Sequence, residues 1–261
     1  MADQVKIAFF DIDGTMIDIH TKKPTDTMLA ALHQLQEKGV AIVIATGRAA
    51  SIIPDFPGVS FDSYLTFNGS YCFMPDGTEI FSNPIPTHAV QRVMANAAAM
   101  GRPVSIATAR QVLANGVDAD LADFFAIGKV DVPVVDNLDE IVASEPVYQL
   151  QVGGSAEEYV ALVEGVPEAR VVAWWDRAAD VIPSNGGKGR GVLEILAAYG
   201  LSPDQAIAFG DGRNDIEMLQ TVGWGVAMGN AKPVVKEAAD DVCGDVADDG
   251  IYHYLRAHGV L

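Results

Sequence analysis

The sequence contains few cysteines and no long apolar segment, and each shortage excludes a class of protein. Cys72 and Cys243 are the only cysteines among 261 residues, too few for a disulfide scaffold or a zinc site. The five histidines show no spacing typical of metal ligands. No apolar run reaches the roughly 18 residues that a membrane-spanning helix needs, so we expect no membrane partner.

Basic residues are also scarce. There are 17 Lys and Arg against 35 Asp and Glu, which gives a net charge of -18. This balance predicts that nucleic acid and anionic membranes are not the main partners, because both need a basic protein face. A small anionic substrate stays compatible if a metal and one or two cations act locally. The N-terminal segment has no leader-like apolar core, so we expect a cytoplasmic protein.

An acidic pair follows the first apolar segment. Residues 5–10 predict a buried parallel strand, and Asp11 and Asp13 come directly after it, before a Gly14-Thr15 turn. If the strand continues through the pair, both carboxylates point to one side of the sheet. Their repulsion would favour a hard divalent cation, most simply Mg²⁺. The alternative is a solvated acidic turn; an EF-hand would need its glycine at the sixth position.

A second strand ends in a threonine. Residues 25–38 predict a helix and residues 40–46 a second apolar strand, which together with the first strand form a right-handed βαβ unit. This unit places Thr46, Gly47 and Arg48 beside the acidic pair. A hydroxyl and backbone N–H groups at the start of a following helix suit an anionic oxygen. Alternatively, Thr46 simply closes the strand.

The middle of the chain predicts a domain of its own. Pro84 and Pro86 form a break, and helices then mix with short strands, which favours a small α+β unit. A second glycine- and proline-containing linker follows it. Helices are expected over residues 88–100, 121–127, 138–143 and 156–163, and strands over residues 104–107, 148–152, 171–175 and 180–182. We place the core at residues 1–84 and 184–261 and the inserted domain at residues 85–183.

A lysine opens the helix that follows the insertion. Lys188 stands in a glycine cluster, residues 185–191, before an apolar helix over residues 192–199. The cluster lacks the leading glycine and the Ser or Thr of a Walker A loop, and its glycine spacing differs from the Rossmann fingerprint. A lysine beside the N–H groups of a helix start can still bind phosphate. The alternative is a flexible linker with an incidental lysine.

A second acidic loop follows a later strand. Residues 205–210 predict another buried strand, which leads into Asp211 and Asp215 at a helix start. Acids four residues apart on a helix share a face. Open α/β sheets bind ligands at this carboxyl edge of their strands. Residues 225–228 predict an edge strand further along.

The ordered set of segments resembles the haloacid dehalogenase (HAD) superfamily of phosphotransferases. Residues 11–15 match its first motif, Thr46 the second, Lys188 the third and residues 210–215 the fourth. Asn68-Gly69, the hairpin after it and the long insertion look like the Cof-type phosphatases with a large α/β cap. Thr46 stands where many members have serine, which keeps the hydroxyl. The resemblance implies an α/β fold with a Rossmann-like doubly wound parallel-sheet core and an inserted α+β cap.

The resemblance also implies roles for the acidic residues. Asp11 would be the nucleophile that forms an aspartyl-phosphate. Asp13 would be the general acid for the leaving alcohol and then the base for water. Mg²⁺ would be held by Asp11, Asp211 and the backbone carbonyl of Asp13, with Asp215 close behind as an orienting residue or further ligand.

Other matched residues would bind substrate. The phosphoryl oxygens would be neutralised by Thr46, the Gly47 N–H, Lys188 and Asn214. Arg48 and Asn68 are further candidate substrate contacts. The insertion would be a cap that closes over the site, excludes water and carries most substrate contacts. Candidates within it are Arg102, Arg110 and the Trp174-Trp175 pair, although two tryptophans on one strand are more often core or interface residues.

The sequence therefore predicts a Mg²⁺-dependent phosphatase that hydrolyses a small phosphorylated metabolite, such as a sugar phosphate, through an aspartyl-phosphate. Two alternatives stay open: a phosphomutase or dedicated sugar-phosphate phosphatase of the same superfamily, and a non-catalytic module that binds a phosphate ligand. Against the non-catalytic module stand the intact Asp11, Asp13, Lys188 and Asp211. The sequence specifies neither the physiological substrate nor the oligomeric state.

Overall fold

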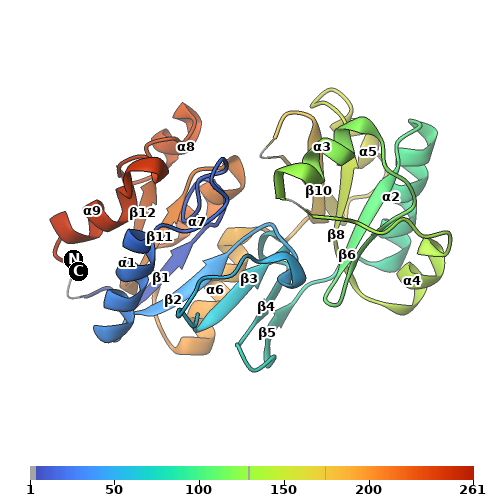
Figure 1. Cartoon of the computed structure of the whole chain (residues 1–261). Helices are drawn as coiled ribbons and strands as arrows, with labels where there is room; N and C mark the ends of the chain where they lie inside the picture. Colours follow the sequence, from blue (N-terminus) through green and yellow to red (C-terminus); the bar gives the residue numbers. More distant parts are fainter. Residues whose placement is uncertain (1–3, 129, 174) are drawn as a thin grey trace. The chain divides into compact units, whose positions relative to one another are not determined.

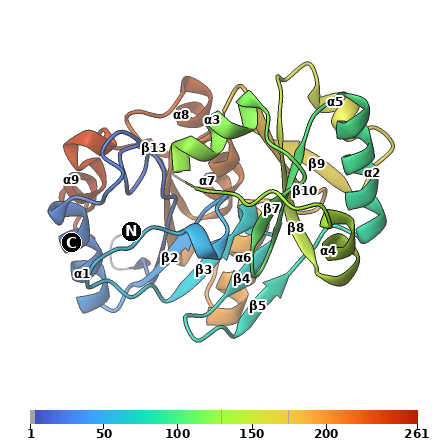
Figure 2. The same ribbon diagram turned by 45° about the vertical axis from the view of Figure 1, so that its right-hand side comes forward.

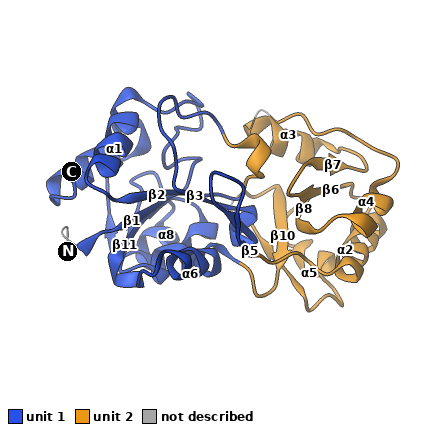
Figure 3. Cartoon of the chain, turned by 90° about the horizontal axis from the view of Figure 1, so that it is seen from below, with its two compact units in different colours: residues 1–47, 54–81, 187–261 blue, residues 48–53, 82–186 orange. Residues whose placement is uncertain are grey.

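The chain folds into two compact units, seen in a computed structural model that describes residues 4–128, 130–173 and 175–261 (Figure 1). The first unit comprises the segments up to Gly47, from Pro54 to Phe81 and from Gly187 to Leu261; the second comprises Arg48–Ile53 and Ser82–Gly186 (Figure 3). The second unit thus begins at Ser82 and not at residue 85, the boundary expected from the sequence. It ends at Gly186 instead of residue 183, and residues 48–53 group with it.

Among the described residues, the first unit contains an eight-stranded sheet in the order β13-β12-β11-β1-β2-β3-β4-β5. The strands are β1 (Ile7–Phe10), β2 (Ala41–Ala45), β3 (Ser63–Thr66), β4 (Tyr71–Phe73), β5 (Glu79–Ser82), β11 (Ala206–Gly210), β12 (Trp224–Ala227) and β13 (Asp241–Val242). All pairs from β13 to β3 are parallel, and β4 runs antiparallel to β3. The chain proceeds from β1 towards β3 on one side and from β11 towards β13 on the other, so the order switches between β1 and β11. The predicted doubly wound α/β core is confirmed.

Helices cover both faces of this sheet, as a buried parallel sheet requires (Figures 1 and 2). They are α1 (Asp26–Glu37), α6 (Lys188–Tyr199), α7 (Ile216–Thr221), α8 (Pro233–Ala238) and α9 (Gly250–Ala257). Side chains of α6, α7 and α8 share one apolar cluster with Ile7 and Phe9. Because side chains alternate along a strand, Phe10 faces the other way; its ring stacks on Phe209, which contacts Tyr254 of α9.

The second unit has a five-stranded antiparallel sheet in the order β7-β6-β8-β10-β9, counted over the residues described. Its elements are α2 (Thr87–Ala99), β6 (Val104–Thr108), β7 (Val112–Ala114), α3 (Ala119–Gly128), α4 (Leu138–Ser144), β8 (Val147–Gly153), α5 (Tyr159–Leu162), β9 (Ala169–Val172) and β10 (Ala178–Pro183). Helices α2, α4 and α5 pack their apolar side chains with Leu150 and Val181 in a core separate from that of the first unit.

Four local expectations are wrong. Asp211 and Asp215 do not share a helix face, because Asp211 precedes the 3-10 turn Arg213–Asp215 and α7 begins only at Ile216. The strand expected at an edge, β12, pairs with both β11 and β13, because the two-residue β13 gives too short a pattern to recognise. Strand β1 ends at Phe10, and Asp13 lies in the turn that follows, bridged to Ile17. The alternation of side chains along a strand therefore does not place Asp13 on the same side of the sheet as Asp11. The segment after Gly47 forms a single 3-10 turn, Ala50–Ile52, instead of an α-helix.

A bilayer-spanning segment would need a long apolar helix. None of the helices in the described part of the chain has that length and hydropathy.

Candidate active site

Strands β1 and β11 bring two acidic loops together. Asp11 follows β1 and Asp211 follows β11, and the two strands pair in register with Phe10 beside Phe209. The Asp11 N–H donates to the Phe209 carbonyl at 3.1 Å, which extends the pairing by one rung. Both loops therefore leave the sheet at the switch point, the position where α/β sheets bind ligands.

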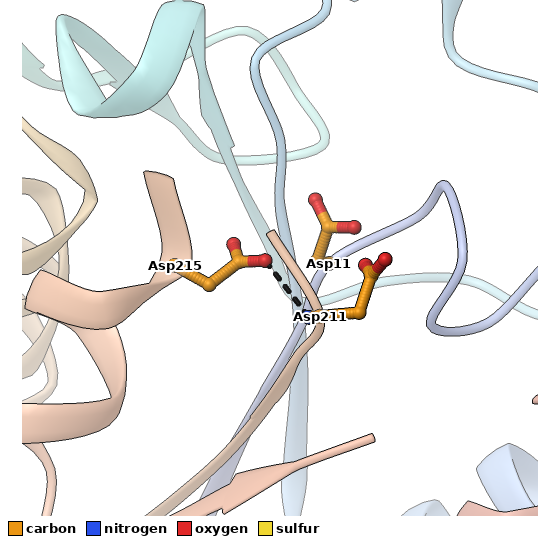
Figure 4. Close-up of side chains that lie close together, drawn as sticks. All are labelled: Asp11, Asp211 and Asp215. Atoms are coloured by element: carbon orange, nitrogen blue, oxygen red, sulfur yellow. Dashed lines mark hydrogen bonds between the residues drawn. The ribbon is translucent and has the colours of Figure 1, made fainter. Parts of the chain in front are cut away.

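Three carboxylates gather at this switch point (Figure 4). Asp11, Asp211 and Asp215 each offer an oxygen, and these oxygens lie within 4.8 Å of one another. Asp11 is 7% exposed and Asp215 only 1%. Closely spaced carboxylate oxygens are the ligands that hard divalent cations prefer. This donor set fits a metal ion, and the group can hold one.

Lys188 joins two of these carboxylates. Its ammonium donates to Asp11 Oδ1 at 2.6 Å and to Asp215 Oδ1 at 2.5 Å. The side chain is fully buried and belongs to the first residue of α6. Lys188 is therefore a fixed part of a buried charge cluster, and the alternative of an incidental lysine in a flexible linker is excluded.

The cluster holds three carboxyl groups against one ammonium group. Burial raises the pKa of Asp11 well above its usual value; Lys188 opposes this, and the charges of Asp215, Asp211 and Asp13 reinforce it. Burial and the charge of Asp215 raise the pKa of Asp211 to about 7, against the opposing effects of Thr15 and Lys188. Burial would lower the pKa of Lys188, but Asp11 and Asp215 raise it above its usual value. A bound cation would relieve this imbalance.

Asp215 organises the loop that carries Asp211. Its Oδ2 accepts the backbone N–H groups of Asp211 at 3.0 Å and Gly212 at 2.8 Å, while its Oδ1 accepts Lys188. A Cβ atom at Gly210 would lie 2.5 Å from the Asp215 Cβ, so only glycine leaves room for this side chain. The fourth motif is thus held by Asp215.

The turn after Asp11 contacts Asp211 directly, which sequence reasoning did not anticipate. Thr15 Oγ1 donates to Asp211 Oδ1 at 3.1 Å. Gly14 has φ +83°, and a Cβ atom there would lie 2.8 Å from the Asp211 Cγ. Asn230 braces the same turn, since its Nδ2 donates to the Gly14 carbonyl at 2.8 Å. The Gly-Thr pair was a signal for the first contact; nothing in the sequence signals the Asn230 contact.

The remaining core candidates also meet. Asn214 Nδ2 donates to Asn68 Oδ1 at 3.0 Å, and the Asn68 N–H donates to the Thr46 carbonyl at 3.0 Å. A Cβ atom at Gly47 would lie 3.1 Å from the Asn68 amide group. Thr46 and Asn68 are each 1% exposed. Residues from the second and fourth motifs are thus linked through Asn68.

Other predicted residues lie in different surroundings. Asp13 is half-buried, and its negative charge acts on Asp11 and Asp211. The Arg48 guanidinium donates to the Ile52 carbonyl at 2.9 Å, and Arg48 groups with the second unit.

The candidates within the insertion differ from one another. The Arg102 guanidinium binds three carboxylates of its own unit, those of Asp118, Asp120 and Glu158. Arg110 is exposed. Trp174 lies outside the described residues, and the Trp175 ring lies 5.2 Å from the Arg177 guanidinium.

Fold and site together define an α/β enzyme with an acidic centre at the switch point of its sheet. The haloacid dehalogenase-like hydrolase family matches residues 8–255, and the chain belongs to this family. YkrA of Bacillus subtilis is 32% identical over 258 residues, which cover 98% of each chain. The pyridoxal phosphate phosphatase YbhA of Escherichia coli is 26% identical and covers 97% of this chain and 98% of its own.

A solved structure gives the same result. The structure of the HAD subclass IIB sugar phosphatase BT4131 superimposes with a TM-score of 0.91 over 98% of this chain and 100% of its own, and the two sequences are 31% identical. The predicted superfamily and the predicted enzyme class, a phosphatase, are confirmed.

Proposed function

We propose that the protein is a Mg²⁺-dependent phosphatase that hydrolyses a small phosphomonoester, such as a sugar phosphate, in the cytoplasm. The observation that carries this proposal is the buried Asp11, in contact with Lys188 and grouped with two further carboxylates. The substrates in the names of BT4131 and YbhA, a sugar and pyridoxal phosphate, support a small phosphorylated metabolite. The strong negative charge, -18, supports a compact substrate rather than a polyanion.

In the proposed reaction, Asp11 is the nucleophile. One carboxylate oxygen of Asp11 forms a bond to phosphorus while the bond from phosphorus to the leaving oxygen breaks. Asp13 gives its proton to that oxygen, which departs as an alcohol. Asp13 then takes a proton from the water that attacks the aspartyl-phosphate. The second step releases inorganic phosphate and restores the Asp11 carboxylate.

The metal site is proposed at Asp11, Asp211 and the backbone carbonyl of Asp13. Asp215 is proposed to orient Asp211, because its oxygens already accept two backbone N–H groups and the Lys188 ammonium. When bound, Mg²⁺ supplies positive charge that offsets the carboxylates and the phosphoryl oxygens. A buried all-oxygen donor set suits this cation.

The phosphoryl oxygens are proposed to be bound by Thr46, the Gly47 N–H, Lys188 and Asn214, with Arg48 as a substrate contact. Lys188 contributes a full positive charge in a buried environment, where it interacts with a phosphoryl group more strongly than in water. The second unit is proposed as the cap of this phosphatase subclass.

The test is phosphate release from a mixed panel of phosphomonoesters, with Mg²⁺ and with a chelator. Asp11→Asn should lower turnover by about a thousandfold or more, because a carboxamide cannot form the aspartyl-phosphate. Asp76→Asn is the matched control, since Asp76 accepts the Thr78 N–H in an exposed hairpin turn of the first unit. Metal-dependent turnover retained by Asp11→Asn would exclude the nucleophile assignment. No release by the native chain from any panel member would favour the binding module.

A further inference from the structure

Three consecutive residues between β3 and β4 have left-handed backbone conformations. Phe67, Asn68 and Gly69 have φ values of 51°, 52° and 87°. This region is disfavoured for residues with a side chain, and a bulky residue such as Phe67 rarely adopts it. Phe67 is 0% and Asn68 1% exposed. Because such a conformation persists only where its surroundings fix it, the contacts of this turn give the reason for it.

One contact is with the segment of the second motif. The Asn68 N–H donates to the Thr46 carbonyl at 3.0 Å. The Asn68 amide group lies so near Gly47 that a Cβ atom there would be 3.1 Å from it. The turn therefore fixes the backbone that presents the Thr46 hydroxyl and the Gly47 N–H.

The turn also contacts the third and fourth motifs. A Cβ atom at Gly69 would lie 2.8 Å from the Gly187 carbonyl carbon and 3.2 Å from the Lys188 Cα, so the two backbones touch. Asn68 Oδ1 accepts Asn214 Nδ2 at 3.0 Å. One short turn thus touches all three segments from which the proposed phosphate ligands come.

We propose that Asn68 is a positioning residue for phosphate binding, which acts through Asn214 and not through a contact of its own with substrate. The inference rests on the proposed function, since it takes Asn214 as a phosphate ligand. The Asn214 amide nitrogen carries two N–H groups, and with one directed to Asn68 the direction of the other is set. The hydrogen bond that engages Asn68 Oδ1 with Asn214 favours this role over its prediction as a direct substrate contact.

A double-mutant cycle tests the coupling of Asn68 and Asn214. Asn68→Gly removes the side chain and keeps the left-handed backbone accessible. The measured quantity is the dissociation constant of inorganic phosphate in Mg²⁺, determined by calorimetry. Asn68→Gly and Asn214→Ala should each weaken binding by about tenfold. Because the two residues act in series, the double variant should also lose about tenfold.

Each other outcome overturns the inference in a distinct way. A hundredfold loss in the double variant would mean that Asn68 acts independently of Asn214, and unchanged affinity in Asn68→Gly would mean that the Asn68 side chain is only structural. Asn115→Gly is the matched control: its Oδ1 accepts the Val104 N–H in the second unit, so it should change the melting temperature and leave phosphate affinity unchanged. A native chain that binds no phosphate would overturn the proposed function together with this inference.

Discussion

At the scale of single residues, the site concentrates buried charge that the fold does not need. Lys188 contacts Asp11 and Asp215 inside the protein, yet buried ion pairs contribute little to stability because desolvation offsets their attraction. Asp211 adds a further carboxylate close by. A fold selected only for stability would have apolar side chains here, so this cluster is best explained by binding and chemistry.

We predict that Mg²⁺ affinity rises with pH between about 6 and 8. The raised pKa of Asp211, about 7, means that this carboxyl group still holds a proton near neutrality. A ligand carboxylate must lose that proton before it binds a cation. Below pH 7 the affinity should therefore fall about tenfold per pH unit for each proton displaced. Calorimetry at pH 6, 7 and 8, in buffers of different ionisation enthalpy, measures both quantities.

Thr15→Val provides the directional control. The hydroxyl of Thr15 donates to Asp211 and lowers its pKa, so its removal should shift the affinity curve to higher pH. In the metal-free protein, the Asp211 carboxyl group should lower the free energy of unfolding as pH rises from about 4 to 7. The unfolded chain releases this proton near pH 4, whereas the folded chain holds it up to about pH 7. An affinity that is constant from pH 6 to 8, without proton release, would contradict the prediction.

At the scale of elements, the sequence indicated the long buried strands clearly and the short exposed strand not at all. Strands β1, β2 and β11 are continuous apolar runs because both faces of a parallel sheet are covered. Strand β13 consists of two exposed residues, and no local pattern indicates it.

In the candidate site, too, local sequence patterns indicate some residues and miss others. Motif spacing indicated Asp11 and Asp211, but the hydrogen bond from Asn230 to the Gly14 carbonyl joins residues that are 216 positions apart in the sequence. Such a contact follows from how the strands pair, and no local sequence pattern contains it. The left-handed turn at Phe67 was likewise hidden, because phenylalanine is not a residue that signals a turn.

The turn between β3 and β4 gives the prediction at this scale. Gly69 and Gly77 have φ values of 87° and 86°, so Ala at either position meets a similar backbone cost. Only at Gly69 would the new Cβ meet the Gly187 backbone; at Gly77 nothing lies within 4 Å. We expect Gly77→Ala to cost about 1 kcal/mol of unfolding free energy and Gly69→Ala about 3 kcal/mol. Urea unfolding of both variants measures the difference, and equal losses would show that the close approach is unimportant.

At the scale of the whole molecule, the two units differ in continuity. The proposed nucleophile, metal ligands and phosphate ligands all belong to the first unit, which three chain segments assemble. Apart from residues 48–53, the second unit is one continuous segment with its own apolar core. The sequence indicated this insertion through its prolines and its change of pattern. Continuity and a separate core are the two properties that allow a segment to fold by itself.

We therefore predict that residues 82–186, expressed alone, fold cooperatively. The segment has about 100 residues, a typical domain size. Its two ends lie side by side, since Asn83 Nδ2 donates to Asn185 Oδ1 at 3.1 Å. The isolated segment therefore retains a contact between its ends. Circular dichroism should show a single urea transition, and calorimetry should show no binding of Mg²⁺ or phosphate. Val93→Asp places a charge at a fully buried position of α2 and should abolish the transition. If the unsubstituted segment shows no urea transition, the apolar core of the second unit needs the first unit in order to fold.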